Sequence, residues 1–159
     1  MNALKELYDA GSVTRFHTKR TIRTQTIGEH SWGVAMILLQ ICKPSAELLK
    51  AALYHDLAES VTGDTPATAK WSSYELKTSL QKLEDNFNKR LGLDLMLSIE
   101  EEELLRWADM LELIMYCQTE VELGNRKMST IILTGIAYLE ARIPPCVEAS
   151  KLLEKLSGR

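Results

Sequence analysis

The chain has 159 residues, of which 45% are hydrophobic and 26% are charged, and its formal net charge at pH 7 is −3. This length suffices for one domain with a real core, and we expect residues 1–159 to form a single domain. The negative balance argues against nucleic acid as a partner, since the chain carries no global basic field. The longest apolar run, Val34 to Leu39, is too short to span a membrane, and the first residues lack the apolar core of a signal peptide.

The three cysteines are widely separated and form no CxxC pair: Cys42, Cys117 and Cys146. An odd number of distant cysteines is typical of reduced core thiols rather than of a disulfide framework. We therefore expect a cytoplasmic protein, or one of the host cytoplasm if a phage encodes it.

Apolar periodicity and capping signals predict helices along the whole chain, and no segment shows the sustained alternation of a strand. Thr26 and Glu29 have the spacing of a capping box, Gly92 is a typical helix terminator, and Pro144-Pro145 stops a helix. The fold class predicted is all-α, a bundle of about six to seven helices without a sheet. The expected helices are 2–10, 26–42, 45–59 (with the His-Asp pair inside it), 72–92 (opened by a capping box at Ser72-Ser73-Tyr74-Glu75), 98 to about 124, about 128–143 and about 146–157, with loops at 12–26 and 60–68.

The third helix carries a histidine, an aspartate and a glutamate in an apolar setting: His55, Asp56 and Glu59. Burying Asp56 ionised and unpaired costs several kcal/mol, so it needs a partner or a metal. His55 and Glu59 are four residues apart and share one helix face. A His-Asp dipeptide alone is uninformative, and its meaning depends on the rest of the chain.

Two further residues of the same kind stand in apolar helices. His30 lies in the first turn of the second helix, where a satisfied structural histidine is the alternative to a ligand. Asp109 lies in the middle of the fifth helix, where an ion pair with Arg106 or another cation is the alternative. Together His30, His55, Asp56 and Asp109 supply two imidazoles and two carboxylates from three helices, as metal sites in bundles do. This mixed set suits one divalent transition metal per site, Mn²⁺, Co²⁺, Fe²⁺ or Zn²⁺, with Mg²⁺ as a further candidate, and is a poor match for Ca²⁺.

The order His…His-Asp…Asp resembles the signature of the HD-domain metal phosphohydrolases. Residues 15–18 and 26–35 look like the opening of the HD-domain 5′-deoxynucleotidases, and residues 55–59 and 62–66 look like their central block. Ala108-Asp109 with Glu120 and Gly124-Asn125 resembles their last motif, so the resemblance covers roughly residues 12 to 126.

The resemblance implies a role for each matching residue. His30, His55, Asp56 and Asp109 would be the metal ligands, Glu59 would handle the attacking water or its proton, and Asp64 would be a second catalytic or substrate-orienting carboxylate. Arg15 would bind the phosphate, a role that suits a guanidinium because its paired N–H donors match phosphate oxygens. The aromatic residue that follows would exclude a 2′-hydroxyl, although it is Phe16 here where the family usually has tryptophan. Lys70 is a further candidate for phosphate contact, with a solvated lysine as the alternative.

The interval from Asp56 to Asp109 is shorter than in the bacterial enzymes and is similar to that of compact phage members that hydrolyse dATP. The function expected first is therefore a dATP or dNTP triphosphohydrolase, for which the basic residues Lys19, Arg20 and Arg23 would meet the added charge unless they form a solvated loop. The alternatives are a 5′-deoxynucleotidase acting on dNMPs only and a non-catalytic nucleotide-binding HD module. The retention of Glu59 and Asp64 favours an enzyme over a binding module. Its relatives imply a homo-oligomer, with a deoxynucleotide as the substrate.

Overall fold

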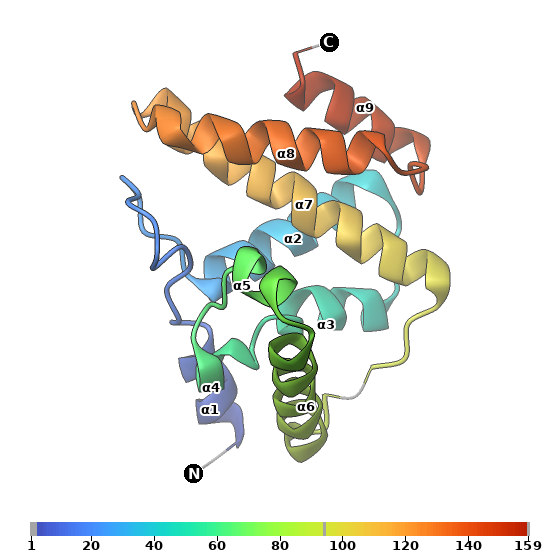
Figure 1. The fold of residues 1–159 in the computed structure, drawn as a ribbon. Coiled ribbons are helices and arrows are strands. Elements are labelled where there is room, and N and C mark those ends of the chain that lie inside the picture. The colour runs from blue at the N-terminus through green and yellow to red at the C-terminus, as the bar shows by residue number, and fades with distance from the viewer. Residues whose placement is uncertain (1–2, 94, 159) are drawn as a thin grey trace.

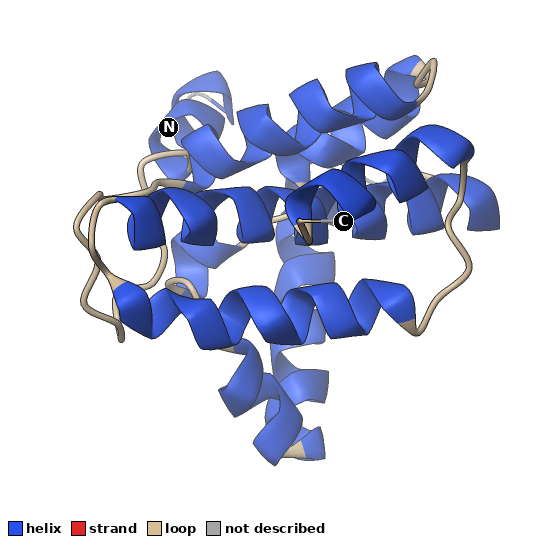
Figure 2. Ribbon diagram, turned by 90° about the horizontal axis from the view of Figure 1, so that it is seen from above, coloured by secondary structure: helices blue, strands red, loops and turns tan. Residues whose placement is uncertain are grey.

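The computed structural model describes residues 3–93 and 95–158, and within them it contains helices and loops but no strand (Figures 1 and 2). Seven of the helices have eight residues or more, which confirms the all-α prediction. The elements are α1 (Ala3–Ala10), α2 (Ile27–Ile41), α3 (Ala46–Tyr54), α4 (Glu59–Thr62), α5 (Ala67–Ser72), α6 (Tyr74–Leu91), α7 (Ile99–Glu122), a 3₁₀ turn η1 (Arg126–Met128), α8 (Ser129–Glu140) and α9 (Val147–Leu156).

The long helix α7 runs across the middle of the molecule, with α8 and α9 on one side and α3 and α6 on the other (Figure 1). The main core joins α2, α3, α7, α8 and α9, and Leu38, Trp107 and Leu111 are among its fully buried side chains. A second cluster around Ile27 and Phe87 joins α1 and α6 to the start of α2. The two clusters hold α2 from both ends, and α2 is thereby a rigid support for residues that project from it.

Helix starts follow the polar caps that the sequence contains. Thr26 and Ser98 each form a capping box with the glutamate three residues later, at the starts of α2 and α7. Ser45 caps α3 through the backbone N–H of Leu48. Gly92 ends α6 in the left-handed conformation, with φ of 67°. These four boundaries agree with the prediction because each depends on local hydrogen bonds.

The prediction that His55 and Asp56 lie inside a regular helix is wrong. Helix α3 ends at Tyr54, and the chain continues in tighter turns in which Leu57 N–H donates to the Tyr54 carbonyl and Glu59 N–H to the Asp56 carbonyl. The chain re-forms a helix only for the single turn of α4, which Gly63 ends with φ of 75°. His55 and Asp56 stand in these turns, and their side chains meet His30 of α2, as described below.

The segment between α4 and α6 also differs from its prediction. Residues 60–68 were expected to be a loop, but α4 occupies the start of this segment and α5 begins within it, directly after Pro66. The N-cap of α6 is Ser73, whose hydroxyl accepts from Leu76 N–H, and no capping box forms because the third helical residue is a leucine. Farther along the chain, α7 ends two residues and α8 three residues before the approximate ends that the sequence predicted.

Trp107 and Trp32 differ in burial. Trp107 is fully buried, whereas the side chain of Trp32 on α2 is 64% exposed and lies in line with the exposed Met36 and Leu39. A stripe of this kind is consistent with the expected homo-oligomer, which stays a prediction. Among the described residues, no helix combines the length and the apolar character needed to cross a lipid bilayer.

Candidate active site

Donor atoms of His30, His55 and Asp56 lie within 4.8 Å of one another, and Asp109 on α7 contacts the first of them. His30 Nε2, on α2, lies 3.3 Å from His55 Nε2, 3.6 Å from Asp56 Oδ2 and 3.1 Å from Asp109 Oδ1. His55 Nε2 lies 3.5 Å from Asp56 Oδ2. The turn after α3 therefore faces α2 and α7, and the four residues whose spacing suggested a metal site are brought together.

Both histidine rings are held so that the same nitrogen faces this cluster. His30 Nδ1 is 2.5 Å from Glu112 Oε2, and His55 Nδ1 is 2.9 Å from the carbonyl oxygen of Ala52. Each acceptor fixes the proton on Nδ1, which leaves the lone pair of Nε2 directed at the other ring. With two carboxylates beside these nitrogens, which lie 3.3 Å apart, the cluster favours a positive charge there, either a proton on His30 Nε2 or a bound metal ion.

The separations fit a metal ion as the source of that charge. Zn–N bonds are about 2.0–2.1 Å long, so two neighbouring donors on one ion lie between about 2.9 Å and about 3.4 Å apart in octahedral or tetrahedral geometry. The separations of 3.1 Å and 3.3 Å lie in this range, and those of 3.5 Å and 3.6 Å lie slightly above it. His30, His55 and Asp56 have donor atoms within 4.8 Å of one another, and Asp109 joins them through its contact with His30. This set could hold a first-row divalent cation, whose affinity for imidazole nitrogen and carboxylate oxygen is high.

The same geometry shifts the pKa values of His30 and Asp109. Burial lowers the pKa of His30, but the hydrogen bonds to Asp109 and Glu112 outweigh it and raise the value to about 9. Burial raises the pKa of Asp109, but the bond from His30 and the proximity of His55 outweigh it and hold the value at about 2. The alternative for Asp109, a pair with Arg106 or another cation, is met by His30 at 3.1 Å and not by Arg106, which binds Glu103 on the solvent side of α7.

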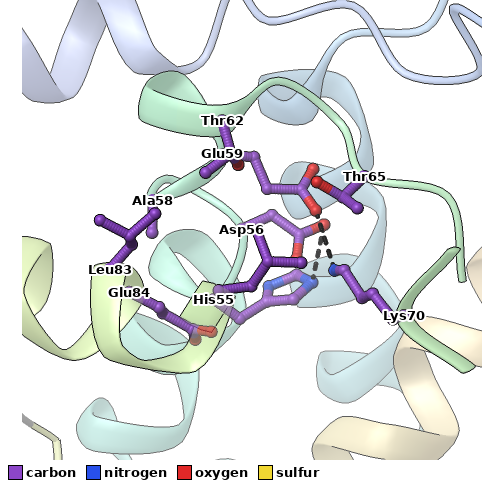
Figure 3. Close-up of a pocket in the computed structure, with 10 residues that line it drawn as sticks. His55, Asp56, Ala58, Glu59, Thr62, Thr65, Lys70, Leu83 and Glu84 are labelled. Atoms are coloured by element: carbon purple, nitrogen blue, oxygen red, sulfur yellow. Dashed lines mark hydrogen bonds and ion pairs between the residues drawn. The ribbon is translucent and has the colours of Figure 1, made fainter. Parts of the chain in front are cut away.

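Glu59 lies next to this cluster in a pocket that it shares with His55, Asp56, Lys70 and Glu84 (Figure 3). Lys70 Nζ is 3.2 Å from Glu59 Oε1, whereas the buried Glu59 Oε2 has no hydrogen-bond partner among the described residues. Burial, followed by the negative charge of Asp56, raises the pKa of Glu59 to about 7. A carboxyl group with such a pKa both accepts and releases a proton readily near neutral pH.

Arg15 reaches the cluster from the loop 12–26. Its Nη1 lies 3.2 Å from Gln25 Oε1 and 3.5 Å from Glu112 Oε2, so the guanidinium contacts the same glutamate that holds His30. Only 12% of the Arg15 side chain is exposed. An arginine fixed this close to a cation site is well placed to bind a phosphate that also reaches the cation.

Phe16 follows Arg15 in an unusual backbone conformation, with φ of 57°. Its N–H donates to Asp64 Oδ2 at 2.6 Å, and its ring stacks on Tyr116 with centroids 5.1 Å apart. The left-handed region is costly for a residue with a large side chain, so these two contacts must hold Phe16 in place. Asp64, expected as a catalytic or substrate-orienting carboxylate, is here bonded to the backbone of the residue expected to select the sugar.

One predicted residue has a different partner from the one expected, and two residues of the site were not predicted. Lys70, expected to contact phosphate, pairs with Glu59. The glutamate on which His30 and Arg15 both depend, Glu112, was not predicted, and neither was Gln25. Glu112 stands one turn after Asp109 among apolar residues, a pattern that could have drawn attention to it, whereas nothing in the sequence distinguishes Gln25.

The chain resembles known proteins in sequence. The model of the YfbR-like 5′-deoxynucleotidase family matches residues 4–150. A 5′-deoxynucleotidase of Yersinia pestis (strain Pestoides F) is 29% identical over 140 residues, which cover 72% of this chain and 71% of that protein. The 5′-deoxynucleotidase of Yersinia pseudotuberculosis serotype I (strain IP32953) matches to the same extent.

Solved structures share the fold at lower identity. An HD-domain phosphohydrolase of Listeria innocua has a TM-score of 0.75 at 20% identity, covering 98% of this chain and 86% of that one. The cyanophage S-2L HD phosphohydrolase DatZ, bound to dA and one catalytic Zn²⁺ ion, has a TM-score of 0.70 at 21% identity, covering 100% and 99%. With a family model that matches nearly its whole length, the chain belongs to the YfbR-like 5′-deoxynucleotidase family, and it shares its fold with these HD-domain phosphohydrolases.

Proposed function

We propose that this hydrolase removes the 5′-phosphate from 2′-deoxyribonucleoside 5′-monophosphates. The observation that carries the proposal is the position of Arg15, whose guanidinium shares Glu112 with His30 and so lies beside the cluster of donor atoms. The family and its curated relatives, which are 5′-deoxynucleotidases, support the same reaction.

The triphosphohydrolase expected first from the chain's compactness has less support. It rests on a likeness of fold to DatZ, whose structure contains dA rather than a triphosphate. Of the basic residues expected to meet a triphosphate, Arg23 lies 3.9 Å from Glu29 with half of its side chain exposed, and Lys19 and Arg20 are exposed. One buried arginine at the cluster suits a single phosphate group.

His30, His55, Asp56 and Asp109 would hold the metal, because donor atoms of the first three lie within 4.8 Å of one another and Asp109 Oδ1 lies 3.1 Å from His30 Nε2. A divalent cation held there would supply Lewis acidity, neutralising charge on phosphoryl oxygens and lowering the pKa of water. DatZ binds zinc, which is one candidate among the first-row ions for this chain. Arg15 would bind the remaining phosphoryl oxygens and fix the phosphorus in line with the attacking water.

Glu59 would move the proton. A water oxygen attacks phosphorus, the bond from phosphorus to the 5′-oxygen breaks, and the proton lost by the water passes through Glu59 to that leaving oxygen. The unpartnered Oε2 of Glu59 is free to accept the proton, while Lys70 holds Oε1. Lys70 therefore acts by orienting Glu59 in this scheme, and its expected contact with phosphate is not needed.

The reaction itself is tested with a panel of deoxy- and ribonucleoside mono- and triphosphates, with Mn²⁺ or Co²⁺ present. We expect inorganic phosphate from dAMP and other dNMPs at a higher kcat/KM than from AMP, and little hydrolysis of dATP. Release of tripolyphosphate from dATP with a kcat/KM above that for dAMP would contradict the proposal and favour the triphosphohydrolase.

Removal of a proposed ligand should remove the metal. We expect His55→Ala and Asp56→Ala each to abolish activity and to lower the bound metal, measured by elemental analysis after dialysis. Glu47→Ala, on the exposed side of α3, is the control and should keep both. If both ligand variants retained stoichiometric metal, the proposed site would be wrong.

The sugar preference should depend on Phe16. In Phe16→Ala the space beside C2′ opens, and we expect the ratio of kcat/KM for dAMP over AMP to fall. Asp64→Ala should lower the same ratio, since it removes the acceptor that holds Phe16 N–H in its left-handed turn. An unchanged ratio in Phe16→Ala would exclude this residue from sugar selection.

Glu59→Gln keeps the shape of the side chain but cannot accept a proton. We expect a folded variant that retains its metal and binds nucleotide, with kcat reduced by about 10²–10⁴-fold, the usual range for positioned proton transfer. Metal content, nucleotide affinity and kcat measured on this one variant separate the roles. Loss of metal would make Glu59 a ligand, and an unchanged kcat would exclude it as the proton carrier.

A further inference from the structure

We propose that Glu112 is a positioning residue that serves the metal site and the phosphate-binding arginine at the same time. The proposal rests on the roles proposed above for His30 and Arg15. It assigns to Glu112 the role of fixing the positions of these two side chains relative to each other. Glu112 lies on α7, one turn after Asp109, and is only 8% exposed. It is absent from the linings of the two pockets that border His55, so we assign it a role that acts through its neighbours.

The carboxylate of Glu112 is surrounded by donors. Oε2 accepts from His30 Nδ1 at 2.5 Å and lies 3.5 Å from Arg15 Nη1. Oε1 accepts from Gln25 Nε2 at 2.7 Å, and the carbonyl oxygen of that same amide accepts from Arg15 at 3.2 Å. Gln25 is itself 4% exposed. The four side chains therefore form a closed buried network in which each one restricts the others.

This network requires a carboxylate. A glutamine in place of Glu112 would present one acceptor oxygen and one NH₂ group, and that NH₂ would face His30 Nδ1–H or the amide of Gln25, both of which are donors. A carboxylate also makes His30 a better electron donor at Nε2 by accepting its Nδ1 proton in a charge-assisted bond. The loss of the hydrogen-bond network would affect Arg15, which would contact the phosphate, and the weaker basicity would affect His30 Nε2, which would contact the metal.

The opposite helix is shaped to admit this side chain. Gly33, in the middle of α2, faces Glu112, and a Cβ built on Gly33 would lie 2.8 Å from Glu112 Cγ and 3.2 Å from Oε1. Real Cβ atoms do not approach so closely, so any larger residue at position 33 would displace the carboxylate from His30. Glycine inside a helix is unfavourable relative to alanine, and here it gives Glu112 its path to the ring.

The test uses Co²⁺ as the probe, added to chelator-stripped protein and measured by competition with a chromogenic chelator and by the visible Co²⁺ spectrum. In Glu112→Gln we expect the Co²⁺ affinity to fall by about 10–100-fold, as is typical when the partner of a metal-bound histidine is changed. The spectrum should also change because His30 is no longer fixed. In the Glu59→Gln background, which slows turnover, dAMP affinity should fall as well, because Arg15 loses its anchor.

Gly33→Ala provides an independent route to the same result. It leaves every polar group in place but moves Glu112, so we expect a loss of Co²⁺ affinity similar to that of Glu112→Ala. The double variant Gly33→Ala/Glu112→Ala should lose no more affinity than Glu112→Ala alone, since the clash requires the Glu112 side chain. Additive losses would mean that Gly33 acts in another way and would contradict the proposal.

Glu120→Gln is the matched control. Glu120 is a second buried carboxylate on the same helix, but it binds the backbone N–H groups of Ile22 and Arg23 instead of a histidine. We expect it to lower thermal stability and to leave Co²⁺ affinity and spectrum unchanged. Wild-type affinity and spectrum in Glu112→Gln, with metal lost in His55→Ala, would overturn this inference and leave the proposed function standing. Retention of metal in His55→Ala would instead overturn the proposed site.

Discussion

A single polar stripe on α7 holds the site and the loop in front of it. Asp109, Glu112, Tyr116 and Glu120 follow one another at intervals of three or four residues and share one face of the helix. Asp109 and Glu112 bind His30, and Tyr116 and Glu120 bind the loop 12–26. The opposite face of α7 carries Trp107, Leu111 and Ile114 into the main core. Packing of that apolar face therefore fixes the position of α7 and its rotation about its axis, and with them the positions of the polar groups on the stripe.

Charge placed so deep in a bundle must be compensated locally. Glu112 and Glu120 are almost fully buried, and each carboxylate accepts several hydrogen bonds. Their different partners give them different tasks. Glu120 satisfies backbone N–H groups of a loop that lacks regular secondary structure, whereas Glu112 binds a titratable ring and a guanidinium. The pKa shifts of His30 and Asp109 express the same compensation, since each group is charged because the other is near.

Local signals predicted much of the fold, and long-range contacts account for what they missed. The caps at Thr26, Ser45 and Ser98 were found because a cap involves residues three apart. The end of α3 at Tyr54 could not be found in this way, because the helical pattern continues through Glu59 and the turn is favoured by what His55 and Asp56 meet on α2 and α7. The ligand set His30, His55, Asp56 and Asp109 stays a prediction, for which the contacts of His30 with the other three are the support. Glu112 was missed because its partners, His30 and Gln25, are more than 80 residues away in the chain.

The loop 12–26 is attached to the rest of the molecule largely through its backbone. Asp64 accepts from Phe16 N–H, Glu120 accepts from Ile22 N–H and Arg23 N–H, Tyr116 donates to the Arg23 carbonyl and Asn125 to that of Arg20. Hydrogen bonds to backbone N–H and carbonyl groups do not depend on which side chains the loop carries. The outward side chains of this loop, such as those of Thr18, Lys19 and Arg20, can therefore change during evolution while the backbone keeps its course. Arg15 and Phe16 then keep their positions at the site.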